Sequence, residues 1–210
     1  MILVLDTATR MPVVAIARPD GAVIAERRWQ SHHHHGEELL QRLDELLAEA
    51  GVDKRGLSGV IVGTGPGSFT GLRIGLATAK TIAYALGIPV VGISSTRAIA
   101  LASAATGRGR SEIAVTLPAG AADRYVHRFR VVDGVPVELE PPQLVASALG
   151  QDELDGEDID GLAAALAALG TSALAAGQRD DPHSLVPAYV ALPRGIARAA
   201  AEMKWSPDLR

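Results

Sequence analysis

A glycine-rich segment between an apolar run and a long helical pattern constrains the fold more than any other feature of the chain. Gly63-Thr64-Gly65-Pro66-Gly67-Ser68-Phe69-Thr70-Gly71 follows Leu57–Gly63, which is typical of a buried strand. It precedes Gly71–Leu86, which we expect to form a helix that ends at Gly87. A second buried strand is predicted over Val90–Ile93. Strands that alternate with helices in this way predict an α/β fold with helices covering a sheet.

The residues before this segment predict a strand meander and an amphipathic helix. The turn Pro19-Asp20-Gly21 joins the last two of three β-prone runs, which suggests antiparallel pairing. Leucines recur at helical spacing over Gly36–Ala50, and Gly51 is placed to end that helix. Ser95 or Thr96 is placed to cap a further helix that runs through Ala105. The three β-prone runs are Ile2–Asp6, Val13–Ala17 and Val23–Arg27.

A Gly/Arg-rich linker at Thr106–Arg110 divides the chain into a predicted first lobe, 1–105, and a second, 106–210. In the second lobe, Asp133-Gly134 is typical of a hairpin turn between two strands. The expected elements there are strands at Ile113–Leu117, Arg124–Val132 and Val135–Leu139, a helix at Gly161–Leu169 and a terminal helix at Arg194–Lys204 that packs back.

Composition limits the classes of function that the chain can serve. With 20 Lys and Arg against 24 Asp and Glu, the formal net charge is −4, which predicts no strong unaided hold on a nucleic-acid backbone. The absence of cysteine excludes thiolate metal sites and thiol catalysis. No apolar stretch reaches the roughly 20 residues of a spanning helix, and the first residues lack a basic leader, so we expect no membrane role and a cytoplasmic location.

Two interpretations of the glycine-rich segment remain open. Backbone N–H groups at the start of a helix can receive an anion. The segment does not match the Walker A pattern, because no Gly-Lys-Ser/Thr follows it, nor the dinucleotide fingerprint, because Thr70 stands where the third glycine belongs. A tight strand-to-helix turn, with Ser68 or Thr70 capping the helix, explains the same residues without a ligand.

The helix after the segment carries a ridge of small residues that also has two interpretations. Gly71, Gly75, Ala79 and Ala83 recur every four residues, which lets another element approach closely. That element is either part of this chain, such as its sheet or the helix at 36–50, or a partner protein.

The segment Gly65-Pro66-Gly67-Ser68-Phe69-Thr70-Gly71-Leu72-Arg73-Ile74-Gly75 resembles the signature of the TsaB (YeaZ) family. Leu5-Asp6-Thr7-Ala8-Thr9, the helix start at 35–40 and the segment 87–95 match in the same order, so the resemblance covers 1–105. It implies an actin-like (ASKHA) fold of two related lobes, each with a mixed β-sheet and flanking helices. The second lobe is reduced, and no complete ATPase site is expected.

The resemblance also implies a non-catalytic accessory role. Members pair with the paralogous threonylcarbamoyltransferase TsaD, together with the ATPase TsaE, to form threonylcarbamoyl-adenosine at position 37 of ANN-decoding tRNAs. They also form homodimers, contact tRNA mainly through the complex and hold no intrinsic cofactor, with ATP or ADP expected only at a complex junction. Helices 36–50 and 71–86 would carry the interface, through Leu40, Leu43, Leu47, Gly71, Leu72, Gly75, Leu76, Ala79 and Ala83.

The chain departs from the family pattern in its second half, and other functions stay open. An expected Asp-Ala-Arg motif is replaced around Pro118-Ala119-Gly120, and Tyr-Leu-Arg is Tyr189-Val190-Ala191. One alternative is a small actin-like ATPase or phosphotransferase, and another is a stand-alone homodimeric binding protein. The candidate anion or nucleotide contacts are Asp6, Gly65, Gly67, Ser68, Thr70 and Arg73.

A metal site and a serine hydrolase site are two further candidates, and a simpler explanation accounts for the residues of each. His32–His35 offers imidazoles, but no second ligand cluster stands nearby, so we expect a solvated loop and no metal. Ser68 with His127 or His183 would suit a hydrolase, but the Gly-x-Ser-x-Gly elbow is absent.

Overall fold

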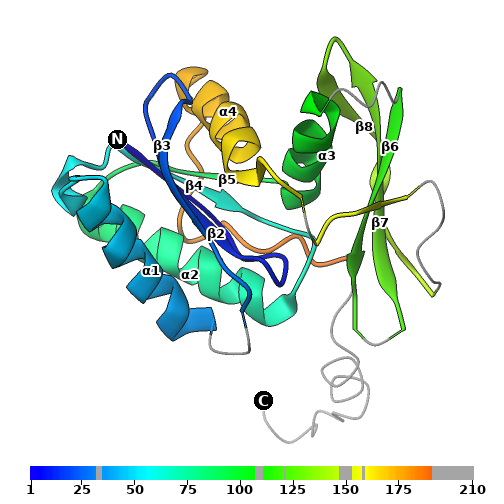
Figure 1. Ribbon diagram of the computed structural model, residues 1–210, viewed down its shortest axis with the longest axis horizontal. Coiled ribbons are helices and arrows are strands. Elements are labelled where there is room, and N and C mark those ends of the chain that lie inside the picture. Colours follow the sequence, from blue (N-terminus) through cyan, green and yellow to red (C-terminus); the bar gives the residue numbers. More distant parts are fainter. Residues whose placement is uncertain (32–34, 107–110, 121, 147–152, 158, 191–210) are drawn as a thin grey trace, which may run out of the picture.

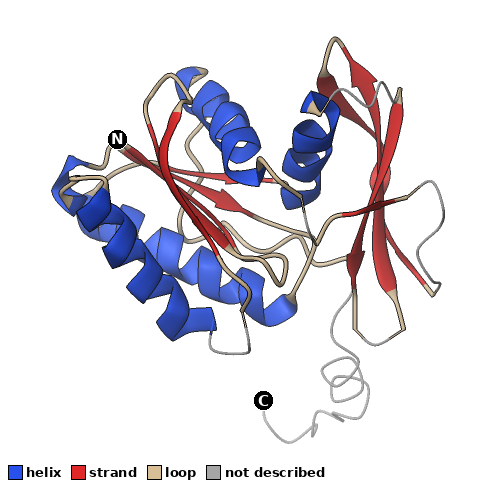
Figure 2. Cartoon of the chain, viewed as in Figure 1, coloured by secondary structure: helices blue, strands red, loops and turns tan. Residues whose placement is uncertain are grey.

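The computed structural model describes residues 1–31, 35–106, 111–120, 122–146, 153–157 and 159–190, which form two sheets with helices around and between them (Figures 1 and 2). The predicted terminal helix at Arg194–Lys204 lies outside the described residues. The predicted lobe boundary stays a prediction.

The first sheet has the strand order β3-β2-β1-β4-β5 and is mixed. β1 pairs antiparallel with β2, and β2 with β3, which confirms the predicted meander. β1 pairs parallel with β4, and β4 with β5, so the carboxyl ends of these three strands meet at one edge. The strands are β1 (Ile2–Asp6), β2 (Val13–Ala17), β3 (Val23–Arg28), β4 (Gly59–Gly63) and β5 (Val90–Ile93).

Two helices cover one face of this sheet, α1 (His35–Glu49) and α2 (Phe69–Leu86). Leu3, Leu5 and Val62 point to this face, and the buried leucines Leu39 and Leu46 of α1 pack against it. The predicted end of α2 is confirmed, since Gly87 follows it with a left-handed backbone, but the helix begins at Phe69, two residues before the predicted Gly71, because Ser68 caps it.

The opposite face of the first sheet is covered by α4 (Leu162–Ala175), while α3 (Ser95–Ala105) lies between α4 and the second sheet, as Figure 1 shows. α3 begins one residue earlier than predicted, because Ser94 is its cap while Ser95 and Thr96 make contacts elsewhere. α4 is longer than the predicted Gly161–Leu169 and is apolar on several sides, as expected of a helix buried between layers.

The second sheet has the order β8-β7-β6-β9 and is also mixed, since β9 pairs parallel with β6 and the others are antiparallel. β8 runs beyond the predicted Leu139 through Pro141 and Pro142, which an edge strand tolerates because its outer N–H groups need no partner. The strands are β6 (Glu112–Pro118), β7 (Arg124–Val132), β8 (Val135–Val145) and β9 (Leu154–Asp155).

One apolar core joins the two sheets. It includes Val4 and Ile61 of the first sheet, Phe129 of the second, and Ile99 and Leu166 of the helices between them. Two mixed sheets with flanking helices match the expected actin-like fold of two lobes. Within the described part of the chain, none of the helices has the length and apolar character that crossing a membrane would require.

Candidate functional site

The carboxyl edge of the parallel strands brings Asp6, the glycine-rich loop and the start of α3 together. The Ser95 hydroxyl donates a hydrogen bond to Asp6 Oδ2, and the Ala8 N–H donates to Asp6 Oδ1 at 2.8 Å. Gly65 N–H in turn donates to Ser95 Oγ at 3.0 Å. Asp6 is only 1% exposed, and this burial raises the pKa of its carboxyl group, which the two hydrogen bonds oppose.

The glycines of the loop face other parts of the chain rather than open space. A Cβ on Gly63 would overlap the Asp6 carboxylate, and one on Gly67 would overlap the Ala8 carbonyl oxygen. A Cβ on Gly65 would lie 2.7 Å from the Leu72 side chain. Close packing within the chain therefore explains why glycine stands at these three positions.

The remaining candidate anion contacts lie at the start of α2. Ser68 Oγ accepts the Gly71 N–H at 3.2 Å, which confirms the predicted cap. Thr70 and Arg73 are exposed, and the Arg73 guanidinium lies 5.3 Å from the centre of the Phe69 ring. The ring centre of Tyr189 lies 5.2 Å from that of Phe69.

The small-residue ridge of α2 packs on this chain's own sheet. A Cβ on Gly71 would overlap the Thr7 carbonyl oxygen, and a Cβ on Gly75 would overlap Thr7 Oγ1. Thr7 Oγ1 also donates to the Gly71 carbonyl at 2.7 Å. The intramolecular explanation therefore applies to the ridge. The candidate interface residues that are buried within the chain are Leu43, Gly71, Leu72, Gly75, Leu76, Ala79 and Ala83.

The outer surface of α1 and α2 is the part that a partner could reach. Leu40 of α1 is 54% exposed and Tyr84 of α2 is 76% exposed. Ala77 and Thr81 are exposed on α2 at the spacing of one helix face, while Leu47 of α1 is half-buried. Sequence periodicity could not find this surface, because its residues are mixed in polarity.

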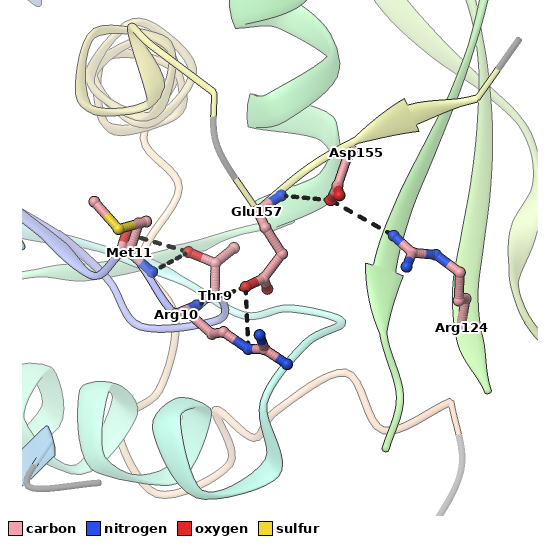
Figure 3. A network of polar contacts seen from close by, with 6 residues as sticks. All are labelled: Thr9, Arg10, Met11, Arg124, Asp155 and Glu157. Atoms are coloured by element: carbon pink, nitrogen blue, oxygen red, sulfur yellow. Dashed lines mark hydrogen bonds and ion pairs between the residues drawn. The ribbon is translucent and has the colours of Figure 1, made fainter. Parts of the chain in front are cut away.

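Ion pairs bridge the second sheet and the first along the segment that leads from β9 to α4 (Figure 3). The Arg10 N–H donates to Glu157 Oε2 at 3.2 Å, and Arg124 Nη2 lies 3.5 Å from Asp155 Oδ1. Burial raises the pKa of Glu157, which the contacts with Arg10 oppose. Glu157 N–H also donates to Asp155 at 3.1 Å, so the two acids belong to one network.

The hydrolase candidates lie in separate surroundings. His127 is buried and its Nδ1 lies 2.7 Å from Thr96 Oγ1, while Ser68 serves as a helix cap. His183 donates its N–H to Asp181 in a turn. The contact between Thr96 and His127 could not be predicted from the sequence, because residues 31 apart in the chain carry no local pattern that indicates contact.

No group of three or more His, Asp or Glu side chains in the described residues could hold a metal ion. The predicted loop His32–His35 falls mostly outside these residues, since only the backbone of His35 is described there.

Comparisons with known proteins give a consistent result. The family model "TsaD: tRNA N6-adenosine threonylcarbamoyltransferase" matches residues 25–136. An uncharacterised protein of Mycobacterium tuberculosis is 42% identical over 99 residues, which are 47% of each chain. The tRNA threonylcarbamoyladenosine biosynthesis protein TsaB of Bacillus subtilis is 36% identical over 99 residues, 47% of this chain and 43% of that protein. The chain thus spans about half the length of the curated relatives it matches.

The solved structure of YeaZ from Pseudomonas aeruginosa superimposes with a TM-score of 0.76 over 90% of this chain and 98% of that one. At 23% identity, this likeness establishes the fold.

Proposed function

The chain belongs to the family described as TsaD, tRNA N6-adenosine threonylcarbamoyltransferase, with TsaB (YeaZ) proteins among its relatives, and from this we propose that it is a non-catalytic accessory subunit. In this role it pairs with a TsaD-type catalytic paralogue during threonylcarbamoyl-adenosine synthesis at position 37 of ANN-decoding tRNAs. A TsaE-type ATPase joins the complex in the cytoplasm, and the chain forms a homodimer when alone.

The observation that carries this proposal is the closed edge at Asp6. An actin-like enzyme needs that edge open to phosphate, whereas here Ser95 and Ala8 occupy the Asp6 carboxylate. Ala8 also covers Gly67. These contacts support the proposal that the chain holds no nucleotide of its own and that any ATP or ADP lies at a junction with the partner.

The exposed surface of α1 and α2 is the proposed docking surface. Leu40 and Tyr84 present large exposed side chains there, and the exposed Ala77 and Thr81 on α2 are small enough to permit close approach of a second helix pair. The buried ridge supports this surface from beneath, because it holds α2 tightly against β1. With a net charge of −4, the chain leaves most tRNA contact to its partner.

The test is complex formation with the TsaD-type paralogue of the same organism, followed by size-exclusion chromatography with light scattering. Ala77→Glu places a charge in the docking surface, and we expect it to abolish the mixed complex without unfolding the chain. Ala164→Glu is the matched control, because Ala164 is exposed on α4 across the sheet. Loss of binding in both variants, or in neither, would contradict the proposed surface. A wild-type chain that binds no paralogue would contradict the function.

A further inference from the structure

Consecutive hydroxyl side chains at the start of α3 connect the two sheets. Ser94 accepts the Arg97 N–H at 3.3 Å, and its Oγ lies 3.1 Å from Thr96 Oγ1. The same Ser94 Oγ is 3.5 Å from the Gly65 carbonyl oxygen in the glycine-rich loop. Thr96 Oγ1 lies 2.7 Å from His127 Nδ1 on β7. A row of polar groups therefore runs from the second sheet to the loop at the edge of the first.

His127 is the titratable end of this row. It is 3% exposed, and its ring centre lies 4.2 Å from that of Phe129. Its buried Nε2 lies 3.2 Å from the Glu138 carboxylate on β8. Hydroxyl, imidazole and carboxylate follow one another as in a hydrolase, but Thr96 is 1% exposed, so a substrate cannot reach it.

The direction of the hydrogen bonds depends on the protonation of His127. A neutral imidazole with its proton on Nε2 accepts at Nδ1, so Thr96 donates to His127 and Ser94 can donate to Thr96. A protonated imidazole donates from Nδ1, so Thr96 accepts from it and donates to Ser94. The Ser94 hydroxyl must then find another acceptor, and the Gly65 carbonyl oxygen is within reach.

We propose that protonation of His127 reverses the hydrogen bonds through Thr96 and Ser94 and thereby strengthens the contact of Ser94 with Gly65. The row is a proton-dependent relay from the second sheet to the glycine-rich loop. It is independent of the proposed partner and of any nucleotide.

The charged groups around His127 set the pH at which the relay reverses. β8 contributes Glu138 and Glu140, while β6 places the uncharged Val115 opposite His127. Burial lowers the pKa of His127, and Glu138 opposes this shift. The reversal therefore falls on the acid side of the ordinary histidine range.

The experiment is an NMR titration of the full chain. Imidazole resonances report His127, and His127→Gln identifies them among the six histidines. The Gly65 carbonyl carbon and the Ser95 amide, which donates to that carbonyl at 3.0 Å, report the loop. We expect the loop signals to shift with the same midpoint as His127.

Thr96→Val removes the connecting hydroxyl and keeps the shape of the side chain, so His127 should still titrate while the loop shift is lost. Thr171→Val is the matched control, because Thr171 is a buried threonine whose hydroxyl bonds within α4, away from the relay. Equal loop shifts in wild type and Thr96→Val would overturn the proposal. The proposal would also be overturned if the loop signals did not shift at the midpoint of His127, or if His127 stayed neutral until the chain unfolds.

Discussion

Gly75 of α2 lies against Thr7, so closely that a Cβ on the glycine would overlap the threonine Oγ1. Thr7 follows Asp6 at the end of β1, and the Thr7 hydroxyl donates a hydrogen bond to the carbonyl oxygen of Gly71, one turn before Gly75 on α2. This contact fixes α2 and the glycine-rich loop together on the sheet edge. A glycine in the middle of a helix is otherwise unfavourable, so the close approach explains why it stands there.

Gly75→Ala tests this contact. In an ordinary helix interior the change stabilises by about 1 kcal/mol, whereas overpacking here should destabilise by about 1–3 kcal/mol. The free energy of unfolding in urea, measured by circular dichroism, distinguishes the two signs. Gly36→Ala in α1 is the control, because a Cβ there meets nothing within 4 Å, and it should be neutral or stabilising. A stabilising Gly75→Ala would show that the helix is not held so closely.

Asp6→Asn tests the closed edge through its pH dependence. Burial raises the pKa of Asp6 above its unfolded value, so the folded state binds the proton more tightly. The stability from this group is complete below the unfolded pKa and is lost as pH rises through the folded pKa. Asparagine does not titrate, so its stability relative to wild type should improve as pH rises from the ordinary range of an aspartate carboxyl group through the raised pKa of Asp6 in the folded state.

Urea unfolding of both proteins across this pH range gives the comparison for Asp6. Asp20→Asn is a control for the loss of one carboxylate, because Asp20 lies in an exposed turn. A constant difference between Asp6→Asn and wild type at all pH values would mean that Asp6 is not buried in a closed edge.

Phe129→Ala and Glu157→Gln separate the forces that join the two sheets. Phe129 is fully buried in the core that spans both sheets, so its removal should destabilise by about 3–5 kcal/mol. Glu157 pairs with an Arg10 side chain that is 75% exposed, so its change should cost no more than about 1 kcal/mol. Thermal unfolding in low and high salt measures both effects. A cost for Glu157→Gln that matches that of Phe129→Ala would show that ion pairs, not apolar packing, hold the sheets together.

Local signals in the sequence predicted much of the first sheet and its helices. Buried parallel strands are continuous apolar runs, and Ile2–Asp6 and Val90–Ile93 match the prediction at both ends, whereas β4 begins at Gly59, two residues after the predicted Leu57. Turn residues also marked the correct places, since Asp133 and Gly134 both have positive φ values in the β7–β8 hairpin.

Tertiary contacts decided the features that the sequence left open. Ser94, Ser95 and Thr96 are all good caps, and only the position of Asp6 and His127 shows that the last two bind elsewhere. The sequence pattern of the ridge at Gly75 is the same whether a sheet or a partner protein packs against it. Periodicity shows that one helix face carries small residues, but it does not show what covers that face. The anion contacts and docking residues stay predictions that the experiments address.

The most direct test of the accessory role is a reconstituted modification reaction. It contains the TsaD-type paralogue, the TsaE-type ATPase, threonylcarbamoyl-adenylate and an ANN-decoding tRNA, and mass spectrometry of the digested tRNA measures the modified adenosine. We predict no product from this chain alone, full product with wild type or Asp6→Asn, and product reduced to the level without the chain with Ala77→Glu. Loss of product with Asp6→Asn in an intact complex would contradict the account, because it would make the closed edge a catalytic site.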